Sequence, residues 1–381
     1  MKKSLLALAL LGAFTASAFA EPSVTLYGRI DTGLVYTHKN LDNTAGSTDT
    51  FSMDSGVTTG SRWGLKGSED IGNAKVGFVL ESGFNSDDGT SGQNNRLFGR
   101  EAQVNISGAY GTLYAGRLGS IASDNGTLGY LGDVSAFPSA YGFVGNQQGS
   151  TGTAYGRYDN TLAYETPTFG GLQGAIMYSF KGDAKVSDSN PKEVANAREN
   201  SGDADRYLAA GLRYKAGKAA VVLTGDMTMY SNDVNNVYHD VDNGYSFILG
   251  GNYDFGVAKV FAKATYFDNQ VNVIDSFSLI KDARALSTPQ ALALKGWGAE
   301  ISTAVPAFGG AFLGTVGYRD AKDVDDGSYK FKRWNAAVGY TYAFSKRTNV
   351  YGLAGYAQEK ANALDRKASG AQVGFGLVHK F

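Results

Sequence analysis

The fold is decided by a stretch near the middle of the chain, residues 244–255, which reads GYSFILGGNYDF. Successive side chains of a β-strand point to opposite faces of the sheet, so a strand with one apolar face shows a period of two residues. Here one face carries Tyr245, Phe247, Leu249, Tyr253 and Phe255, and the other carries Ser246, Gly250, Asn252 and Asp254. Similar units of roughly ten residues recur along the chain and predict an all-β fold.

The period alone does not say which way the apolar face points, because in a soluble sandwich it would pack inward. Aromatic residues at the expected strand ends favour a membrane, since girdles of aromatic side chains mark the two interfaces of a transmembrane barrel. The residues at these ends are Tyr27 and Tyr36, Tyr164 and Phe169, Tyr178 and Phe180, and Tyr340 and Tyr342. We therefore expect the apolar face to point outward, toward lipid.

The expected connections alternate between short and long. Seven short ones fall at Glu69–Gly72, Gly108–Tyr110, Pro167–Gly170, Ala216–Gly217, Gly256–Val257, Pro306–Gly309 and Ser345–Lys346. Eight longer ones, polar or rich in Gly, fall near 37–56, 85–95, 119–156, 181–205, 231–243, 269–291, 321–330 and 359–369. Together they join sixteen strands, with both chain ends on the short-turn side. For residues 21–381 this predicts a transmembrane antiparallel β-barrel that encloses an aqueous lumen.

The first twenty residues have the features of a secretory signal peptide. Lys2 and Lys3 precede an apolar run over residues 5–14, and Ala18-Phe19-Ala20 is a small-x-small cleavage pattern. The apolar run is about half of the roughly 20 residues that a membrane-spanning helix needs. We expect export through a cleaved signal peptide, residues 1–20, and a mature protein that begins near Glu21.

The composition agrees with short strands and tight turns. The chain has 51 Gly and only 6 Pro, and its 23 Tyr and 21 Phe together outnumber Leu. The absence of Cys excludes disulfides and thiolate metal sites, and we expect neither a metal nor a cofactor. A formal net charge of −1 gives no basic footprint for nucleic acid.

Several blocks along the whole mature chain resemble the Gram-negative general porin family, particularly its β-proteobacterial branch. They are Val24–Arg29 (VTLYGR), Ser61–Asp70 (SRWGLKGSED), Gly111–Arg117 (GTLYAGR), Arg157–Tyr164 (RYDNTLAY) with Pro167 and Phe169–Gly171, and His379–Phe381 (HKF). The resemblance implies a water-filled homotrimeric channel of the outer membrane, with sixteen strands. Its expected function is general diffusion of small hydrophilic solutes, without enzymatic activity.

The resemblance also implies a constriction formed by the third extracellular loop, folded into the lumen. In the family this loop begins just after the Gly-Arg block, here Gly116-Arg117, which places it at 119–156. The segment is unusually apolar for a loop, and an apolar segment is costly to leave in water, so it should pack against the lumen wall. Its ionisable residues are Asp124 and Asp133.

Basic residues are expected on the wall opposite these acids. In the first strand Val24, Leu26 and Ile30 share the apolar face, so Arg29 should point into the lumen. The same parity argument places Arg62 opposite Trp63 and Leu65, and Arg157 opposite Leu162 and Tyr164. Fixed charges on the two sides of a constriction act on passing ions, and the arginines favour weak anion selectivity. The alternative is that these are solvated lumen charges without a special role.

Arg100 and Arg117 match further lumen-facing basic positions of the family. Arg100, however, shares parity with Ala102, Val104 and Ile106, which the apolar pattern places outward. If Arg100 points inward, then Glu101, Gln103 and Asn105 should face outward, which would be tolerable only against another subunit. The sequence leaves this conflict open.

Two other functions remain open at this point. A substrate-specific channel, for instance for sugars, would need an aromatic ladder along the lumen, whereas most aromatics lie on the outward parity or at strand ends. An outer-membrane protease or phospholipase with a His-based triad would need side chains from distant parts of the barrel, because the three histidines are His38, His239 and His379.

The chain ends in an alternating strand with a terminal aromatic residue, Phe381. Such an end looks like the signal that the outer-membrane assembly machinery reads. The expected partners are therefore this machinery, further copies of the chain, outer-membrane lipid and lipopolysaccharide, and small hydrophilic solutes.

Overall fold

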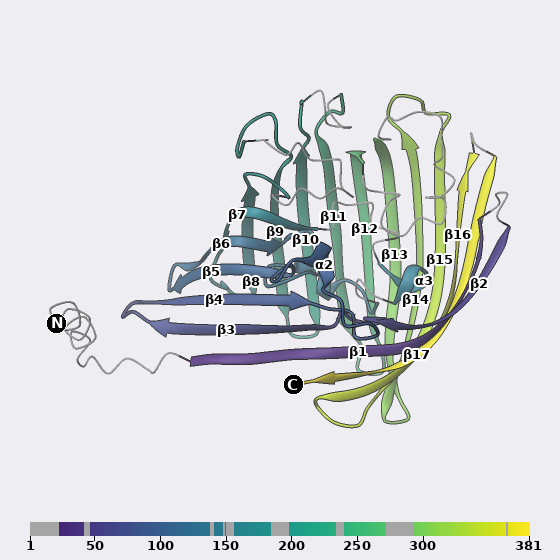
Figure 1. Ribbon diagram of the computed structural model, residues 1–381, viewed down its shortest axis with the longest axis horizontal. Coiled ribbons are helices and arrows are strands. Elements are labelled where there is room, and N and C mark those ends of the chain that lie inside the picture. Colours follow the sequence, from purple (N-terminus) through teal and green to yellow (C-terminus); the bar gives the residue numbers. More distant parts are fainter. Residues whose placement is uncertain are drawn as a thin grey trace, which may run out of the picture.

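The computed structural model describes residues 23–41, 46–137, 141–147, 149, 156–183, 198–233, 240–271, 293–362 and 365–381. The signal peptide predicted at residues 1–20 and His239 lie outside the described residues. Within these ranges the chain forms one antiparallel sheet of seventeen strands (Figure 1).

The strands of the first half are β1 (Ser23–Asn40), β2 (Ser47–Ser55), β3 (Arg62–Asp70), β4 (Ala74–Gly83), β5 (Glu101–Gly108), β6 (Gly111–Gly119), β7 (Arg157–Glu165), β8 (Leu172–Ser179) and β9 (Arg206–Ala216). Those of the second half are β10 (Ala219–Met229), β11 (Gly244–Asp254), β12 (Lys259–Gln270), β13 (Leu294–Ala307), β14 (Gly310–Asp323), β15 (Lys330–Ala343), β16 (Thr348–Ala361) and β17 (Arg366–Lys380).

The sheet closes into a barrel of sixteen strands, because β2 and β3 are two halves of a single strand. β1 pairs with β2 from Thr32↔Ser55 to Asn40↔Ser47, and with β3 from Ser23↔Ser68 to Arg29↔Arg62. Along its other edge β1 pairs with β17, so the described strands leave no open edge. The predicted all-β, sixteen-stranded antiparallel barrel is confirmed.

Two of the predicted loops are wrong in extent. The first was expected at 37–56, but β1 continues to Asn40 and β2 begins at Ser47, because these residues keep pairing in register. The irregular segment lies instead at 56–61, between β2 and β3. The last loop was expected at 359–369, whereas β16 runs to Ala361 and β17 begins at Arg366.

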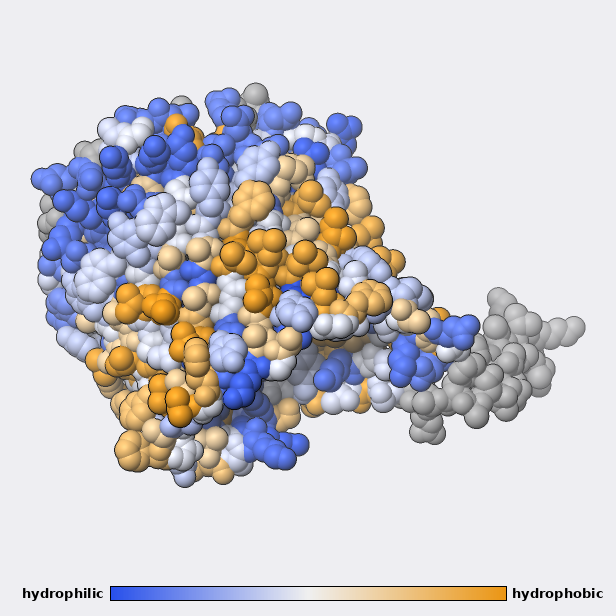
Figure 2. All heavy atoms as spheres, turned by 180° about the vertical axis from the view of Figure 1, so that it is seen from behind, coloured by the Kyte–Doolittle hydropathy of each residue, from blue (hydrophilic) through white to orange (hydrophobic). Residues whose placement is uncertain are grey.

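The apolar face of the alternating strands points outward. In β11, Phe247 is 54% and Leu249 57% exposed, whereas Ile248 between them is fully buried. Figure 2 shows the apolar side chains as a band across the middle of the outer surface, with hydrophilic side chains gathered above it. Tyr27 is an exception to the predicted girdle: its hydroxyl donates to Glu81 Oε2 (3.2 Å), so the ring lies on the inner face.

The helical elements are single turns: α2 (Gly92–Asn95) before β5, and the 3-10 turn η1 (Tyr130–Asp133) and α3 (Gly142–Gly145) between β6 and β7. None of the helices in the described ranges combines the length and the apolar character that crossing a bilayer requires. Both η1 and α3 lie within residues 119–156, the segment that is predicted to fold into the lumen.

Candidate functional site

The segment that follows β6 packs on the face of the sheet opposite the exposed apolar face. Its first part contributes Ile121, Leu128, Tyr130, Leu131 and Val134 to one buried cluster with strands β6 to β11. The strand residues in this cluster are Tyr114, Leu118, Ala163, Ala175, Met177, Tyr207, Ala209, Val222 and Ile248. Burial of these apolar side chains accounts for the contact between segment and wall.

The later part of the segment is held by buried charges as well as apolar contacts. Phe137, Phe143 and Val144 pack against strands β15 to β17. The Arg333 guanidinium donates to the Phe143 carbonyl, and Asn335 Nδ2 donates to the Val144 carbonyl (2.9 Å). Further along, Lys263 Nζ lies 3.1 Å from Gln147 O and 3.2 Å from Glu300 Oε2. Because a buried charge needs hydrogen-bonded partners, these contacts tie the segment to the wall at defined points.

Two tyrosines of the segment are withdrawn from water, Tyr130 fully and Tyr141 in part. Burial raises the pKa of the Tyr141 hydroxyl to about 12. Burial and the neighbouring Glu165 carboxylate raise the pKa of Tyr130, whose hydroxyl donates to Glu165 Oε1 (3.0 Å). Both hydroxyls therefore stay neutral and can act as donors at physiological pH.

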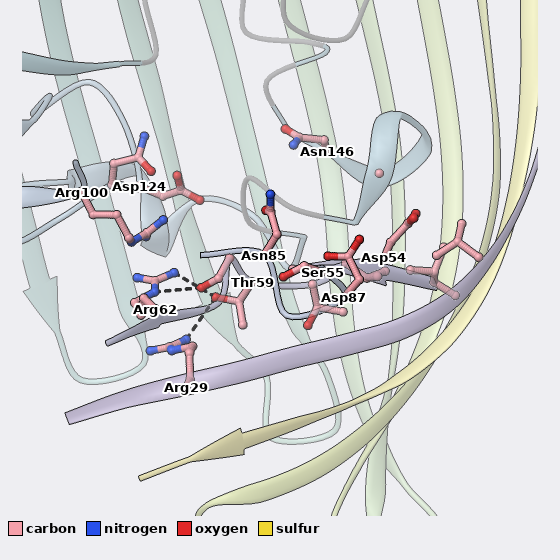
Figure 3. A pocket seen from close by; sticks show the side chains of 18 of the residues that line it. Arg29, Asp54, Ser55, Thr59, Arg62, Asn85, Asp87, Arg100, Asp124 and Asn146 are labelled. Carbon is pink, nitrogen blue, oxygen red and sulfur yellow. Dashed lines mark hydrogen bonds between the residues drawn. The ribbon is translucent and has the colours of Figure 1, made fainter. Parts of the chain in front are cut away.

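Four of the five predicted arginines and one of the two predicted acids line one cavity of about 880 Å³ (Figure 3). The arginines are Arg29, Arg62, Arg100 and Arg157, and the acid is Asp124. The cavity is also lined by Asp54 and Asp87, which the sequence did not single out. In Figure 3, Arg29, Arg62 and Arg100 lie toward one end, with the loop acid Asp124 drawn on the same side as Arg100, and Asp54 and Asp87 lie toward the other end. Two of the three acids are therefore separated from these arginines, whereas Asp124 is not on the opposite side as the sequence predicts.

The segment 56–61 organises the basic end of this cavity. Thr59 Oγ1 accepts hydrogen bonds from Arg29 Nη1 (3.1 Å) and Arg62 Nη2 (3.2 Å). Arg62 Nε also donates to the Gly60 carbonyl (3.0 Å). Thr59 lies between the predicted loop 37–56 and the block that begins at Ser61, so the strand pattern of the sequence does not single it out.

Asp31 anchors the segment 56–61 to the wall. Its carboxylate accepts from the Thr58 amide, the Thr58 hydroxyl and the Thr59 amide, each at 2.8 Å, and from the Tyr351 hydroxyl at 2.6 Å. Gly56, at the start of the segment, has φ +71°, a conformation that favours glycine. The paired threonines between Gly56 and Gly60 are the sequence signal that could have indicated this turn.

The other two arginines of the cavity are held by different partners. Arg100 Nε donates to Glu81 Oε1 (2.7 Å), and Arg62 Nη1 lies 3.6 Å from the same oxygen. Arg157 Nη2 donates to Asn125 Oδ1 (2.8 Å), which connects the wall to the segment after β6. Glu81 thus offsets part of the positive charge of the arginines.

The parity conflict at Arg100 is resolved by its position before β5. Glu101 and Gln103 are buried on the inner face and Val104 is exposed, as the regular alternation requires. Arg100 precedes the strand, so its side chain is not bound by that alternation and reaches the cavity from the same side as Glu101. The expectation that Glu101 and Gln103 face outward is therefore wrong. Glu101 instead accepts from the Thr127 hydroxyl (2.6 Å).

Arg117 and Asp133 make their contacts elsewhere. Arg117 Nη1 donates to Asp159 Oδ1 (2.7 Å), and its Nε donates to the Gly99 carbonyl (2.8 Å). Asp133 Oδ2 lies 2.6 Å from Lys215 Nζ. The structure does not bring these two residues to the cavity of Figure 3.

The chain terminus lies at the seam of the barrel. The Phe381 amide donates to the Gly28 carbonyl (3.1 Å), and the Gly28 amide donates to the Phe381 carbonyl (3.0 Å). The ring lies so close to Gly28 that a Cβ there would meet it at 2.4 Å. Phe381 therefore extends the pairing of β17 with β1 beyond the last strand residue.

The described histidines make separate contacts. His38 Nδ1 lies 2.9 Å from Asp49, while His379 Nδ1 lies 2.9 Å from the Thr348 hydroxyl. In the part of the chain that the structure describes, no three His, Cys, Asp or Glu side chains are grouped to hold a metal ion.

Comparison with known proteins gives a consistent picture. Residues 7–362 match the family described as Gram-negative porin. The chain is 36% identical over 413 aligned residues to an outer membrane porin protein of Bordetella pertussis, with 100% of both chains covered. It is 30% identical to outer membrane porin protein 32 of Delftia acidovorans, with 98% of this chain and 95% of the relative covered. Among solved structures, the anion-selective porin from Comamonas acidovorans matches with a TM-score of 0.67 at 24% identity, covering 95% of this chain and 100% of the other.

Proposed function

We propose that the cavity of Figure 3 is the constriction of this chain, which belongs to the Gram-negative porin family and is an outer-membrane diffusion porin. We also propose that it acts as a channel without enzymatic activity. The inner face of the barrel encloses the lumen, and the segment after β6 narrows it. Arg29, Arg62, Arg100 and Arg157 supply the basic side of the constriction. The main support is that all four arginines line one cavity, in which Arg29, Arg62 and Arg100 lie toward the end away from Asp54 and Asp87.

The proposed ion preference is weakly anionic. Four arginines and the three acids Asp54, Asp87 and Asp124 line the cavity, so the excess of positive charge is small. Three of the arginines lie together at one end, where they attract an anion more strongly than the mean charge suggests. The anion selectivity named for the Comamonas acidovorans porin agrees with this direction.

Passage through the channel is proposed to depend on solute size and charge rather than on a specific binding site. Among the described residues, those that line the cavity include no aromatic side chain on which a sugar ring could stack. Liposome swelling with sugars of increasing size tests this proposal. We expect the rate to fall smoothly with size, and saturation by one sugar would instead indicate a substrate-specific channel.

We further propose that the protein is exported by means of a signal peptide, residues 1–20, which is then cleaved. Its insertion into the outer membrane is proposed to depend on Phe381, and the inserted barrel to form a homotrimer. Strands β5 and β8 have only 8 residues each, whereas β13 to β16 have 14. A spanning strand needs about 9–11 residues, so this low wall is covered better by a second barrel than by lipid. Three barrels around a closed axis satisfy that need, and a monomer on native mass spectrometry in mild detergent would contradict it. Elsewhere the outer surface contacts membrane lipid and lipopolysaccharide.

A further inference from the structure

Five lysines gather on the outer face of β13 to β16, at the ends of these strands that adjoin the long loops. We call Lys295, Lys322, Lys330, Lys332 and Lys360 the lysine cluster. Lys295 is the cross-strand partner of Lys322, and Lys322 is the partner of Lys330. Lys332 is the partner of Lys360 one row nearer the membrane.

The side chains of the cluster point to the outside of the barrel. Lys295 shares parity with the exposed Trp297 and Ile301 of β13, and Lys332 shares parity with the exposed Trp334 and Val338 of β15. In bacterial barrels the long loops are extracellular. The cluster therefore lies at the level of the outer leaflet, outside the lumen.

Aromatic residues border the lysines: Trp297 lies in the same cross-strand row as Lys332, and Tyr318, Trp334 and Tyr356 lie nearer the membrane centre. Trp297 packs against Tyr318 with ring centroids 5.4 Å apart, and Trp334 packs against Tyr356 at 5.3 Å. Amphipathic rings of this kind lie at the headgroup level of a membrane. The lysines beside and just beyond these rings are thus placed where lipid phosphates lie.

The cluster carries an excess of positive charge. Like charges on directly opposed residues destabilise a sheet. Among the described residues, one lysine of the cluster forms an ion pair: Lys332 Nζ lies 3.1 Å from Asp320 Oδ2. The acids Asp325, Asp326 and Asp365 follow in the loops beyond the strand ends, and Glu359 is buried on the inner face. An external anion would relieve the repulsion between the remaining lysines.

Two grooves lie on this wall, one lined mainly by charged side chains and one by apolar side chains. A groove of about 470 Å³ is lined by Lys295, Lys322, Lys330, Lys332, Trp297 and Asp320. A second groove, of about 820 Å³, is lined by apolar and small side chains nearer the membrane centre. Its outward-facing members include Ile301, Gly314, Val316, Ala336, Val338 and Tyr356. Figure 2 shows the same order on the outer surface, with the hydrophilic zone above the apolar band.

We propose that the lysine cluster binds the phosphates of a lipopolysaccharide molecule in the outer leaflet, whose acyl chain lies along the apolar groove below. Lysine ammonium groups act as point charges that phosphate accepts from several directions. The proposal names the site for the lipopolysaccharide contact of the proposed function. It does not depend on the constriction, because the cluster faces away from the lumen.

Titration of the detergent-solubilised full-length porin with purified lipopolysaccharide, read by native mass spectrometry, tests the site. The test variant combines Lys295→Gln, Lys322→Gln and Lys330→Gln. The matched control combines Lys75→Gln, Lys218→Gln and Lys346→Gln, which remove three exposed lysines at the short-turn end. We expect the test variant to bind lipopolysaccharide at least about tenfold more weakly than the native chain, and the control to bind normally.

Two further arms use the native chain, so they remain decisive if the test variant does not fold. Dephosphorylated lipopolysaccharide should bind at least about tenfold more weakly than the phosphorylated form. Phosphatidylglycerol should not displace bound lipopolysaccharide at equal concentration. Equal binding of the dephosphorylated form, equal loss in both triple variants, or displacement by phosphatidylglycerol would overturn the proposal. The reversal potential of the test variant should match that of the native channel, which keeps this result separate from the constriction.

Discussion

Arg29 and Arg62 are cross-strand partners on β1 and β3, and both donate to the hydroxyl of Thr59. Two guanidinium groups on directly opposed residues repel each other. Their shared acceptor, the Thr59 hydroxyl, orients both groups toward the cavity. The basic side of the proposed constriction therefore depends on the interruption between β2 and β3 as well as on the arginines.

Replacement of Thr59 by Val should loosen both arginines, because it removes their common acceptor while it keeps the side-chain volume. We expect a stability loss of about 1–3 kcal/mol, the usual value for hydrogen bonds to charged groups. We also expect more current noise in the open channel. Thermal unfolding and single-channel recording measure the two effects. Thr48→Val, at an exposed position of β2, is the control, and equal behaviour of the two variants would contradict the role of Thr59.

Asp31→Ala should release the segment 56–61 from the wall. The buried carboxylate accepts four hydrogen bonds, so its loss leaves the Thr58 and Thr59 amides and the Tyr351 hydroxyl without their acceptor. We expect a loss of about 2–5 kcal/mol in stability. Asp87→Ala, at an exposed position, should change the unfolding temperature little. A thermally stable Asp31→Ala channel with native conductance would rule out the anchoring role.

The regular alternation of the strands explains why much of this site could be predicted from the sequence. Arg29, Arg62 and Arg157 lie within or at the start of strands, so the parity of their apolar neighbours fixed the side from which they reach the cavity. The strand count also followed from the turns, since β2 and β3 pair with one strand and count as one.

The sequence could not predict the features that depend on irregular backbone or on register. Arg100 precedes β5, so the alternation of side chains along β5 does not predict which side the Arg100 side chain faces. Thr59 and Asp31 meet only because the chain leaves the sheet between β2 and β3. The lysine cluster was not recognised, because its members lie up to 65 residues apart in the sequence and become neighbours only through the register of four strands.

Glu81→Gln should strengthen the anion preference. Glu81 holds Arg100 at 2.7 Å and Arg62 at 3.6 Å, so its neutralisation removes a negative charge from the basic side of the constriction. The reversal potential across a salt gradient should move further toward the anion potential. Glu69→Gln, near the turn that follows β3, should have a much smaller effect. A shift toward cations in Glu81→Gln would contradict the assignment.

Deletion of Phe381 should impair insertion into the outer membrane while secretion continues. The deletion removes the paired hydrogen bonds between Phe381 and Gly28 and the aromatic end of the last strand. Surface labelling of intact cells should detect less of the truncated protein, with the excess in the periplasm. Unchanged surface levels would show that the terminal residue is not needed for assembly.

We propose that a local group of arginines, rather than the total charge of the protein, sets the ion preference. Two unit charges 4 Å apart interact by about 1 kcal/mol in bulk water and by several times more at a lower effective dielectric, which exceeds thermal energy of roughly 0.6 kcal/mol. One arginine at the constriction can therefore change the energy of a passing ion measurably.

The most direct test compares the reversal potentials of Arg62→Glu and Lys360→Glu channels in planar bilayers free of lipopolysaccharide. Both substitutions change the charge by the same amount, but Arg62 lines the cavity and Lys360 lies on the outer face. We predict that Arg62→Glu moves the reversal potential clearly toward the cation potential and that Lys360→Glu leaves it near the native value. Equal shifts in the two channels would contradict a localised constriction.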